Sequence, residues 1–192
     1  MRFAIMPFLA ILAGCGFGHV NQGQVVAYHK NTGMITLVAD SNYREPDRPR
    51  FDVVPAITIH RPDDPRQMGP APEPGKLLAL DAAHSQVIVY DSATGGLRAV
   101  PYTLISEQDG IRQADPRVAG ARFPQVDRSS GAITVYWPHL HKLMEFSVPP
   151  QFRDLPEDTW RIGDEIRYYY KDPAQALRLM NVSKTDLDKA GK

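Results

Sequence analysis

Two histidines in the second half of the chain have the spacing of metal ligands. His139 and His141 stand two residues apart, so an extended backbone would place both imidazoles on one face. A metal site would need a third ligand, from His29, His60, His84 or a carboxylate, and the sequence holds no second pair of closely spaced histidines. The alternative is a pair of solvent-facing histidines beside a turn. We favour that alternative and expect neither a metal nor a cofactor.

Adjacent carboxylates could act as general acid and base if one of them were held in apolar surroundings that raise its pKa. The sequence has three such pairs, Asp63-Asp64, Glu157-Asp158 and Asp164-Glu165. The first pair lies in a proline-rich segment where both should be solvated, and the last opens a strand, where we expect turn chemistry and an outward charge. No Gly-x-Ser-x-Gly elbow, phosphate-binding glycine loop or dinucleotide motif is present. The sequence therefore predicts a protein that is not an enzyme.

Cys15 is the only cysteine, and the residues before it suggest what its thiol does. It ends the tetrad Leu12-Ala13-Gly14-Cys15, which follows one cation, Arg2, and an uncharged apolar run. These are the parts of a secretory signal, and the run is shorter than the ~20 apolar residues that a spanning helix needs. The tetrad resembles the lipobox of bacterial lipoproteins. The alternative is an ordinary signal peptide cut near Ala13 that leaves a free thiol.

The lipobox resemblance implies that residues 1–14 are a signal peptide and that Cys15 becomes the acylated first residue of the mature chain. Two or three acyl chains hold a protein on a membrane stably, whereas one does so only marginally. Gly16 favours the outer membrane, since an aspartate there favours the inner membrane in enterobacterial lipoproteins. We expect a periplasm-facing protein whose residues 15–22 form a lipidated, flexible tether.

Composition excludes some classes of partner. Without residues 1–14 the chain keeps 178 residues, with 21 Lys and Arg against 22 Asp and Glu, a formal charge of −1. A nucleic-acid-binding protein normally carries a basic surplus, so we expect no nucleic-acid partner. Hydrophobic residues make up 43% of the chain, which is adequate for a globular core. With Cys15 acylated, no disulfide within the monomer can contribute to stability.

A repeated pattern predicts three β-hairpins, in residues 24–35, 86–97 and 123–133. Each copy has an apolar run, a polar turn that ends in glycine, and a second apolar run. Hairpin loops of three to five residues place glycine in the left-handed conformation, because glycine adopts positive φ without strain. A hairpin cannot bury its apolar face alone, so we expect these three to pack into sheets or barrels.

A second correspondence divides the chain into two related modules. Residues 51–55 compare with 146–150, and a glycine then opens a strand at Gly75 and again at Gly163. We predict a mainly β protein with little helix, built from two small barrel-like modules of the OB or SH3-like kind. Five prolines between residues 62 and 74 indicate an extended surface loop. The expected boundaries are 23–108 for the N-terminal module, 109–120 for a linker, 121–187 for the C-terminal module and 188–192 for a polar tail.

Three C-terminal motifs carry a resemblance to a known family. They are Leu155-Pro156-Glu157-Asp158-Thr159-Trp160, the segment 163–170 and the segment 176–186. With the lipobox and the paired hairpins, they resemble an uncharacterised family of bacterial lipoproteins, seen mainly in sulfate-reducing bacteria and catalogued as a domain of unknown function. The resemblance covers nearly all of the chain after Cys15. It implies compartment and architecture, and it supplies no catalytic residue and no ligand.

Aromatic residues gather in the second module, where they could stack on sugar rings or contact a partner protein. The alternative is that strand alternation buries most of them in the core. Tyr168 and Tyr170 share a face with Ile166, which predicts core positions for both, whereas Tyr169 lies on the face of Glu165 and Arg167. The candidate surface for a ligand or partner is Tyr169, Trp160 and Trp137.

Together these observations predict a non-catalytic protein of the cell envelope, anchored in a membrane by lipid on Cys15. Its expected role is that of a scaffold or accessory subunit in contact with another envelope protein. The alternative is a β-barrel lipoprotein that binds a saccharide. A third interpretation takes residues 78–95 as one blade of a β-propeller, but the chain is too short to close one.

Overall fold

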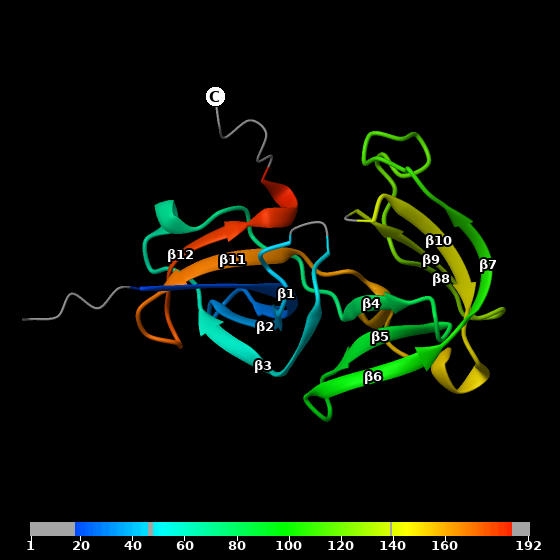
Figure 1. The fold of residues 1–192 in the computed structure, drawn as a ribbon, viewed down its shortest axis with the longest axis horizontal. Helices are drawn as coiled ribbons and strands as arrows, with labels where there is room; N and C mark the ends of the chain where they lie inside the picture. Colours follow the sequence, from blue (N-terminus) through cyan, green and yellow to red (C-terminus); the bar gives the residue numbers. More distant parts are fainter. Residues whose placement is uncertain (1–17, 46–47, 139, 186–192) are drawn as a thin grey trace, which may run out of the picture.

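The computed structural model describes residues 18–45, 48–138 and 140–185, and it has two β lobes side by side (Figure 1). Half of the described residues are in β structure, which confirms the predicted mainly β class. The sheets are antiparallel, and no closed barrel forms among the described residues. Helix in the same residues is limited to short 3-10 turns, η1 (Pro65–Gln67), η2 (Pro150–Phe152), η3 (Glu157–Trp160) and η4 (Val182–Lys184).

The five-stranded lobe is one sheet that joins the two ends of the described chain. Its strand order is β12-β11-β1-β2-β3, with β1 (His19–His29), β2 (Met34–Asp40), β3 (Phe51–His60), β11 (Glu165–Tyr170) and β12 (Ala176–Asn181). Apolar side chains of all five strands form one core, and Met68 of the proline-rich loop packs against it. That loop runs along the outer edge of β12, where Gly69 N–H donates to the Leu179 carbonyl at 2.8 Å.

The sandwich lobe consists of two sheets packed on a common core. One sheet has the order β4-β5-β6 and the other β7-β10-β9-β8. Apolar side chains of both sheets surround the fully buried Trp160. The strands are β4 (Leu77–Asp81), β5 (Gln86–Asp91), β6 (Gly96–Pro101), β7 (Thr103–Gln108), β8 (Gln125–Asp127), β9 (Ala132–Trp137) and β10 (Lys142–Ser147).

All three predicted hairpins are present, as β1–β2, β5–β6 and β8–β9. Gly33, Gly95 and Gly131 have φ of 73°, 69° and 75°, the left-handed conformation that the turn pattern requires. Each turn is closed by the same bond, in which the glycine N–H donates over 2.8 Å to the carbonyl four residues earlier. The local pattern was therefore sufficient to predict these turns.

The predicted division into sequential modules, 23–108 and 121–187, does not match the sheets. β11 pairs with β1, and β7 pairs with β10, so strands of both predicted modules share two of the three sheets. Residues 76–160 form the sandwich lobe and stand as an insertion between β3 and β11 of the five-stranded lobe. The physical reason is that each core draws apolar side chains from both predicted modules, so neither module can bury its apolar faces alone.

Two predicted connecting segments are also part of the folded structure. The tether over 15–22 is too long, because β1 begins at His19 and pairs with β11 from its first residue. The linker over 109–120 contributes Ile111, which is buried and whose carbonyl accepts a hydrogen bond from the Tyr136 hydroxyl at 3.0 Å. The predicted tail at 188–192 lies outside the described residues.

The entry and exit of the sandwich lobe cross at two glycines. The Gly75 N–H donates to the Val25 carbonyl at 3.0 Å, and the Val25 N–H donates to the Asp164 carbonyl at 2.9 Å. A Cβ on Gly163 would lie 2.1 Å from the Val25 carbonyl oxygen, and one on Gly75 would lie 2.5 Å from the Gly163 nitrogen. Because these neighbours are backbone atoms that cannot rotate away, only glycine fits at either position.

The insertion makes a prediction about which fragments fold. Residues 76–162 contain every side chain of the sandwich core, including both tryptophans of the protein. We expect this fragment to melt cooperatively by tryptophan fluorescence. Fragments 23–108 and 121–192 should show no cooperative transition by circular dichroism, because each lacks strands that complete a sheet. Cooperative melting of both of these fragments would contradict the insertion and support two sequential modules.

Candidate functional site

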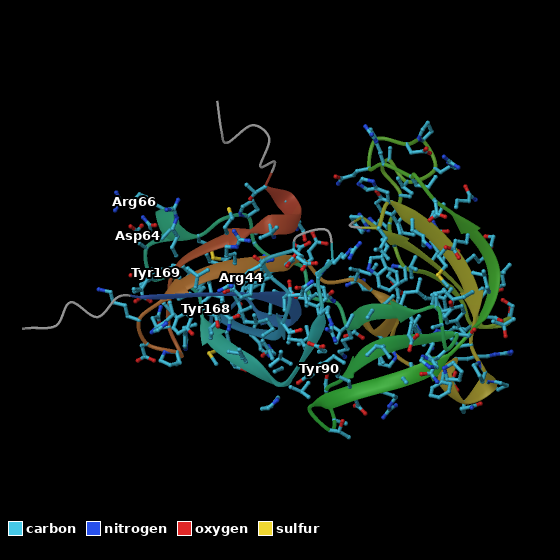
Figure 2. All side chains as sticks on the ribbon, in the orientation of Figure 1. Arg44, Asp64, Arg66, Tyr90, Tyr168 and Tyr169 are labelled. Carbon is cyan, nitrogen blue, oxygen red and sulfur yellow. The ribbon has the colours of Figure 1, made fainter. Side chains whose placement is uncertain are left out.

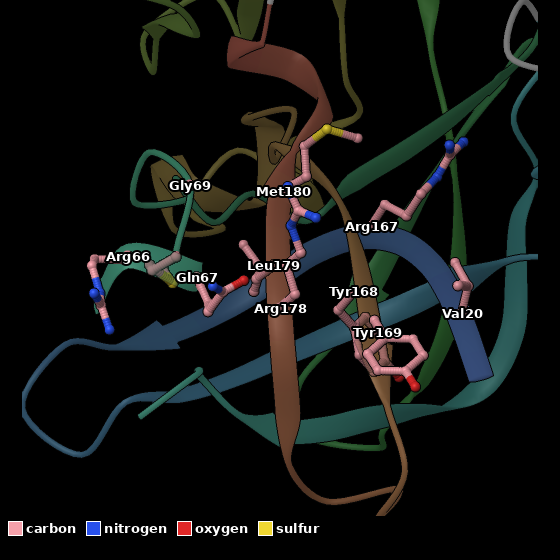
Figure 3. A pocket seen from close by; sticks show the side chains of 11 residues that line it. Val20, Arg66, Gln67, Gly69, Arg167, Tyr168, Tyr169, Arg178, Leu179 and Met180 are labelled. Atoms are coloured by element: carbon pink, nitrogen blue, oxygen red, sulfur yellow. The ribbon is translucent and has the colours of Figure 1, made fainter. Parts of the chain in front are cut away.

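The surface of the five-stranded lobe carries an open groove of about 470 Å³ (Figure 3). Its lining comes from β1, β11, β12 and the loop that contains η1. Three arginines line it, Arg66, Arg167 and Arg178, and the described lining residues include no carboxylate. The groove is therefore a cationic surface on a protein whose formal net charge is zero.

Sheet register explains why these side chains meet. Val20, Tyr169 and Arg178 are paired across three neighbouring strands, and so are Gln22, Arg167 and Met180. Residues two apart on a strand point to the same face, so both rows lie on the face opposite the core residues Tyr168 and Leu179. Neighbouring strands are about 4.8 Å apart, so each row spans about 10 Å.

The three arginines differ in how far their charge is compensated. Arg66 pairs with Asp64 over 3.0 Å, although its side chain is 88% exposed (Figure 2). This pairing lowers the pKa of the Asp64 carboxyl. Arg167 donates from Nε to the Gln22 side-chain oxygen at 2.6 Å. The side chain of Arg178 makes no hydrogen bond or ion pair within the described part of the chain, so it carries the groove's uncompensated charge.

A buried polar cluster supports the groove from one side. The Gln22 amide donates to the Glu165 carboxylate and accepts from Arg167, which joins β1 to β11 through side chains. Gln22 and Glu165 are only 2% and 3% exposed. The expectation that Glu165 carries an outward charge is therefore wrong. A carboxylate so little exposed depends on hydrogen bonds for its stability.

The Tyr169 ring lies beside Gly18, the first residue that the structure describes. A Cβ on Gly18 would lie 2.2 Å from the ring and hydroxyl of Tyr169, so the ring covers the backbone at that residue. Tyr169 is half-buried and lines the groove. Beneath it, burial raises the pKa of Tyr168 to about 12, with a smaller contribution from Tyr170.

The other two candidate surface residues are core residues. Trp160 is fully buried and Trp137 is 5% exposed, and both belong to the sandwich core. The prediction that they present a surface is therefore wrong, because η3 and β9 point these indoles between the two sheets. Trp137 does border a small pocket of about 200 Å³ with Leu140 and Phe51.

A second exposed feature is the free edge of the sandwich lobe. β7 is the outermost strand of its sheet, and among the described residues no strand pairs with its outer edge. Two consecutive apolar side chains on it, Leu104 and Ile105, are 47% and 52% exposed. A free edge with apolar side chains is the arrangement on which a partner's extended segment can add a strand.

The remaining candidate residues do not come together as a metal-ligand cluster among the described residues. Cys15 and the lipobox residues Leu12, Ala13 and Gly14 lie outside those residues, as does His139. His141 is exposed at a turn with φ of 48°. No group of three metal-ligating side chains occurs in the part of the chain that the structure describes.

The carboxylate pairs have structural partners instead. Asp64 caps η1 through the Arg66 N–H, Asp158 pairs with Lys76, and Asp164 accepts from Asn181 at 2.9 Å and pairs with Lys184.

No helix in the described residues has the length and hydropathy to cross a membrane.

Sequence reasoning did not identify the arginine groove. Tyr169 and Arg167 were placed on one strand face correctly, but Arg178 and Arg66 reach that face only through the pairing of β11 with β12 and the loop beside β12. The one available signal was the alternation of Arg178 and Met180 in a segment of strand character.

Comparison with known proteins gives one result. The model of a family described as a domain of unknown function (DUF4881) matches residues 16–190. No curated protein and no solved structure matches the chain.

Proposed function

The chain belongs to the family described as a domain of unknown function (DUF4881), and from that premise we propose that it is a non-catalytic, lipid-anchored protein of the cell envelope. In this proposal the lipid on Cys15 holds the five-stranded lobe at a membrane surface, and the sandwich lobe contacts another envelope protein. The observation that carries it is the tetrad Leu12-Ala13-Gly14-Cys15 around the protein's only thiol. The matched residues begin directly after Cys15, which is consistent with a shared domain that starts where the anchor ends.

The short distance between Cys15 and the fold supports a position close to the membrane. Only three residues separate Cys15 from His19, where β1 begins. A fully extended chain spans at most about 3.6 Å per residue, so these two residues lie within about 14 Å of each other. The polar layer of a bilayer is only about 5–8 Å thick on each side. A lipid on Cys15 would therefore keep the start of β1 beside the headgroups.

The arrangement of the lobes supports a contact role for the sandwich. β1 begins towards one end of the molecule's long axis, and β7 lies towards the other (Figure 1). An anchor at the first end would leave the edge of β7 accessible. Most aromatic side chains of the second half lie in the cores, so they offer little surface for stacking on a sugar. That distribution favours a protein partner over a saccharide. We place the protein in the outer membrane, facing the periplasm.

Replacing the acylated residue tests the anchor. We expect Cys15→Ser to move the protein from the membrane fraction to the soluble periplasmic fraction, because the thioether to the lipid cannot form. Carbonate-washed membranes probed for the tagged protein measure this, and labelled palmitate should enter the wild type alone. A Cys15→Ser protein that stays with washed membranes would contradict the anchor.

Two exposed side chains of β7 test the contact surface. We expect Leu104→Lys with Ile105→Lys to abolish capture of the partner that the wild type retains from its own solubilised envelope. The charges would remove the apolar contact without touching a core, since both side chains are about half exposed. Leu177→Lys, on the five-stranded lobe, is the matched control. Mass spectrometry compares the captured proteins, and equal capture by both variants would exclude this edge.

A further inference from the structure

We propose that the groove of Arg66, Arg167 and Arg178 binds the phosphate of an anionic phospholipid headgroup in the membrane that holds the protein. The inference rests on the proposed lipid anchor and adds a ligand class and a site to it. Its three supports are the charge of the groove, its position beside the start of β1 and its shape.

The charge of the groove suits a phosphate. Guanidinium groups donate in pairs to phosphate oxygens, and such charge-assisted bonds are stronger than neutral ones. The Arg178 guanidinium has no hydrogen-bond or ion-pair partner among the described residues, and Arg167 uses its Nε for Gln22. Asp64 compensates Arg66 at the rim, and the buried Glu165 contacts Gln22 rather than lining the groove. A positive surplus therefore remains where the ligand would lie.

The position of the groove places that charge beside the membrane. Val20 lines it, and Val20 is five residues from Cys15. Val20, Tyr169 and Arg178 stand in one row across three strands, so Arg178 is about 10 Å from Val20 along the sheet. A lipid on Cys15 would hold the whole row within reach of neighbouring headgroups.

The shape of the groove suits a headgroup with part of its glycerol backbone. The apolar side chains of Val20, Met68 and Met180 line the groove together with the arginines. Tyr169 lies between Val20 and Arg178 (Figure 3). Tyrosine, with an apolar ring and a polar tip, is suited to the boundary between headgroup and acyl chain. An acidic protein segment would match the charge alone, whereas a phospholipid would match the charge, the apolar lining and the position.

Vesicle binding by the unacylated protein tests the site independently of the anchor. The mature chain with Cys15→Ser is mixed with vesicles of phosphatidylcholine containing 30% phosphatidylglycerol, and sedimentation measures the bound fraction. We expect binding to these vesicles and none to pure phosphatidylcholine. Arg178→Ala should weaken binding about fivefold, since one cationic residue near an anionic surface contributes about that much. Arg178→Lys should retain most of it.

The controls separate this site from general charge and from free phosphate. Arg112→Ala removes another exposed arginine, from the sandwich lobe, and we expect it to bind as the parent does. Inorganic phosphate at matched ionic strength should not displace the protein, because the site is matched to a headgroup at a surface. Equal loss in Arg112→Ala, displacement by phosphate, or no binding to the anionic vesicles would each overturn the proposal. None of these outcomes affects the fractionation test of Cys15.

Discussion

The crossing of three backbone segments at Gly75, Gly163 and Val25 is the constraint on which the rest of the structure depends. It closes the insertion by bringing the entry and exit of the sandwich lobe onto the middle of β1. The Gln24 side chain reinforces it by donating to the Leu77 carbonyl at 2.8 Å. An added methyl group at either glycine would push backbone against backbone, and overpacking of this kind costs about 1–3 kcal/mol. The crossing therefore fixes the orientation of the sandwich lobe relative to the five-stranded lobe.

Local chemistry and long-range pairing differ in how much the sequence can predict. Hairpin turns depend on a few consecutive residues, so Gly33, Gly95 and Gly131 were sufficient to place them. The insertion depends on β1 finding β11, more than 140 positions away, and no local pattern encodes that partner. Gly75 and Gly163 were recognised as equivalent strand openings, which is correct. That they touch each other follows from the tertiary structure alone.

The same difference explains the candidate site. Tyr169 was predicted to face outwards because alternation along one strand is local information. Trp160 and Trp137 were placed at the surface wrongly, since the second sheet that covers them is formed by strands distant in sequence. The arginine groove was missed because it combines three strands and a loop. The positive charge of the groove is local, and a net charge of zero for the whole chain gives no indication of it.

A functional division of the two lobes follows from this architecture and from the proposed anchor. The five-stranded lobe would rest against the membrane with its cationic groove, and the sandwich lobe would present the edge of β7 away from it. Because Cys15 is the only cysteine, a cysteine introduced elsewhere gives one labelling site in the acylated protein. Spin labels at Gln67→Cys, in the loop beside the groove, and at Leu104→Cys, on β7, can be compared on vesicles with nickel-chelating headgroups. The account predicts strong relaxation of the label at 67 and little at 104; equal relaxation, or the reverse order, would contradict it.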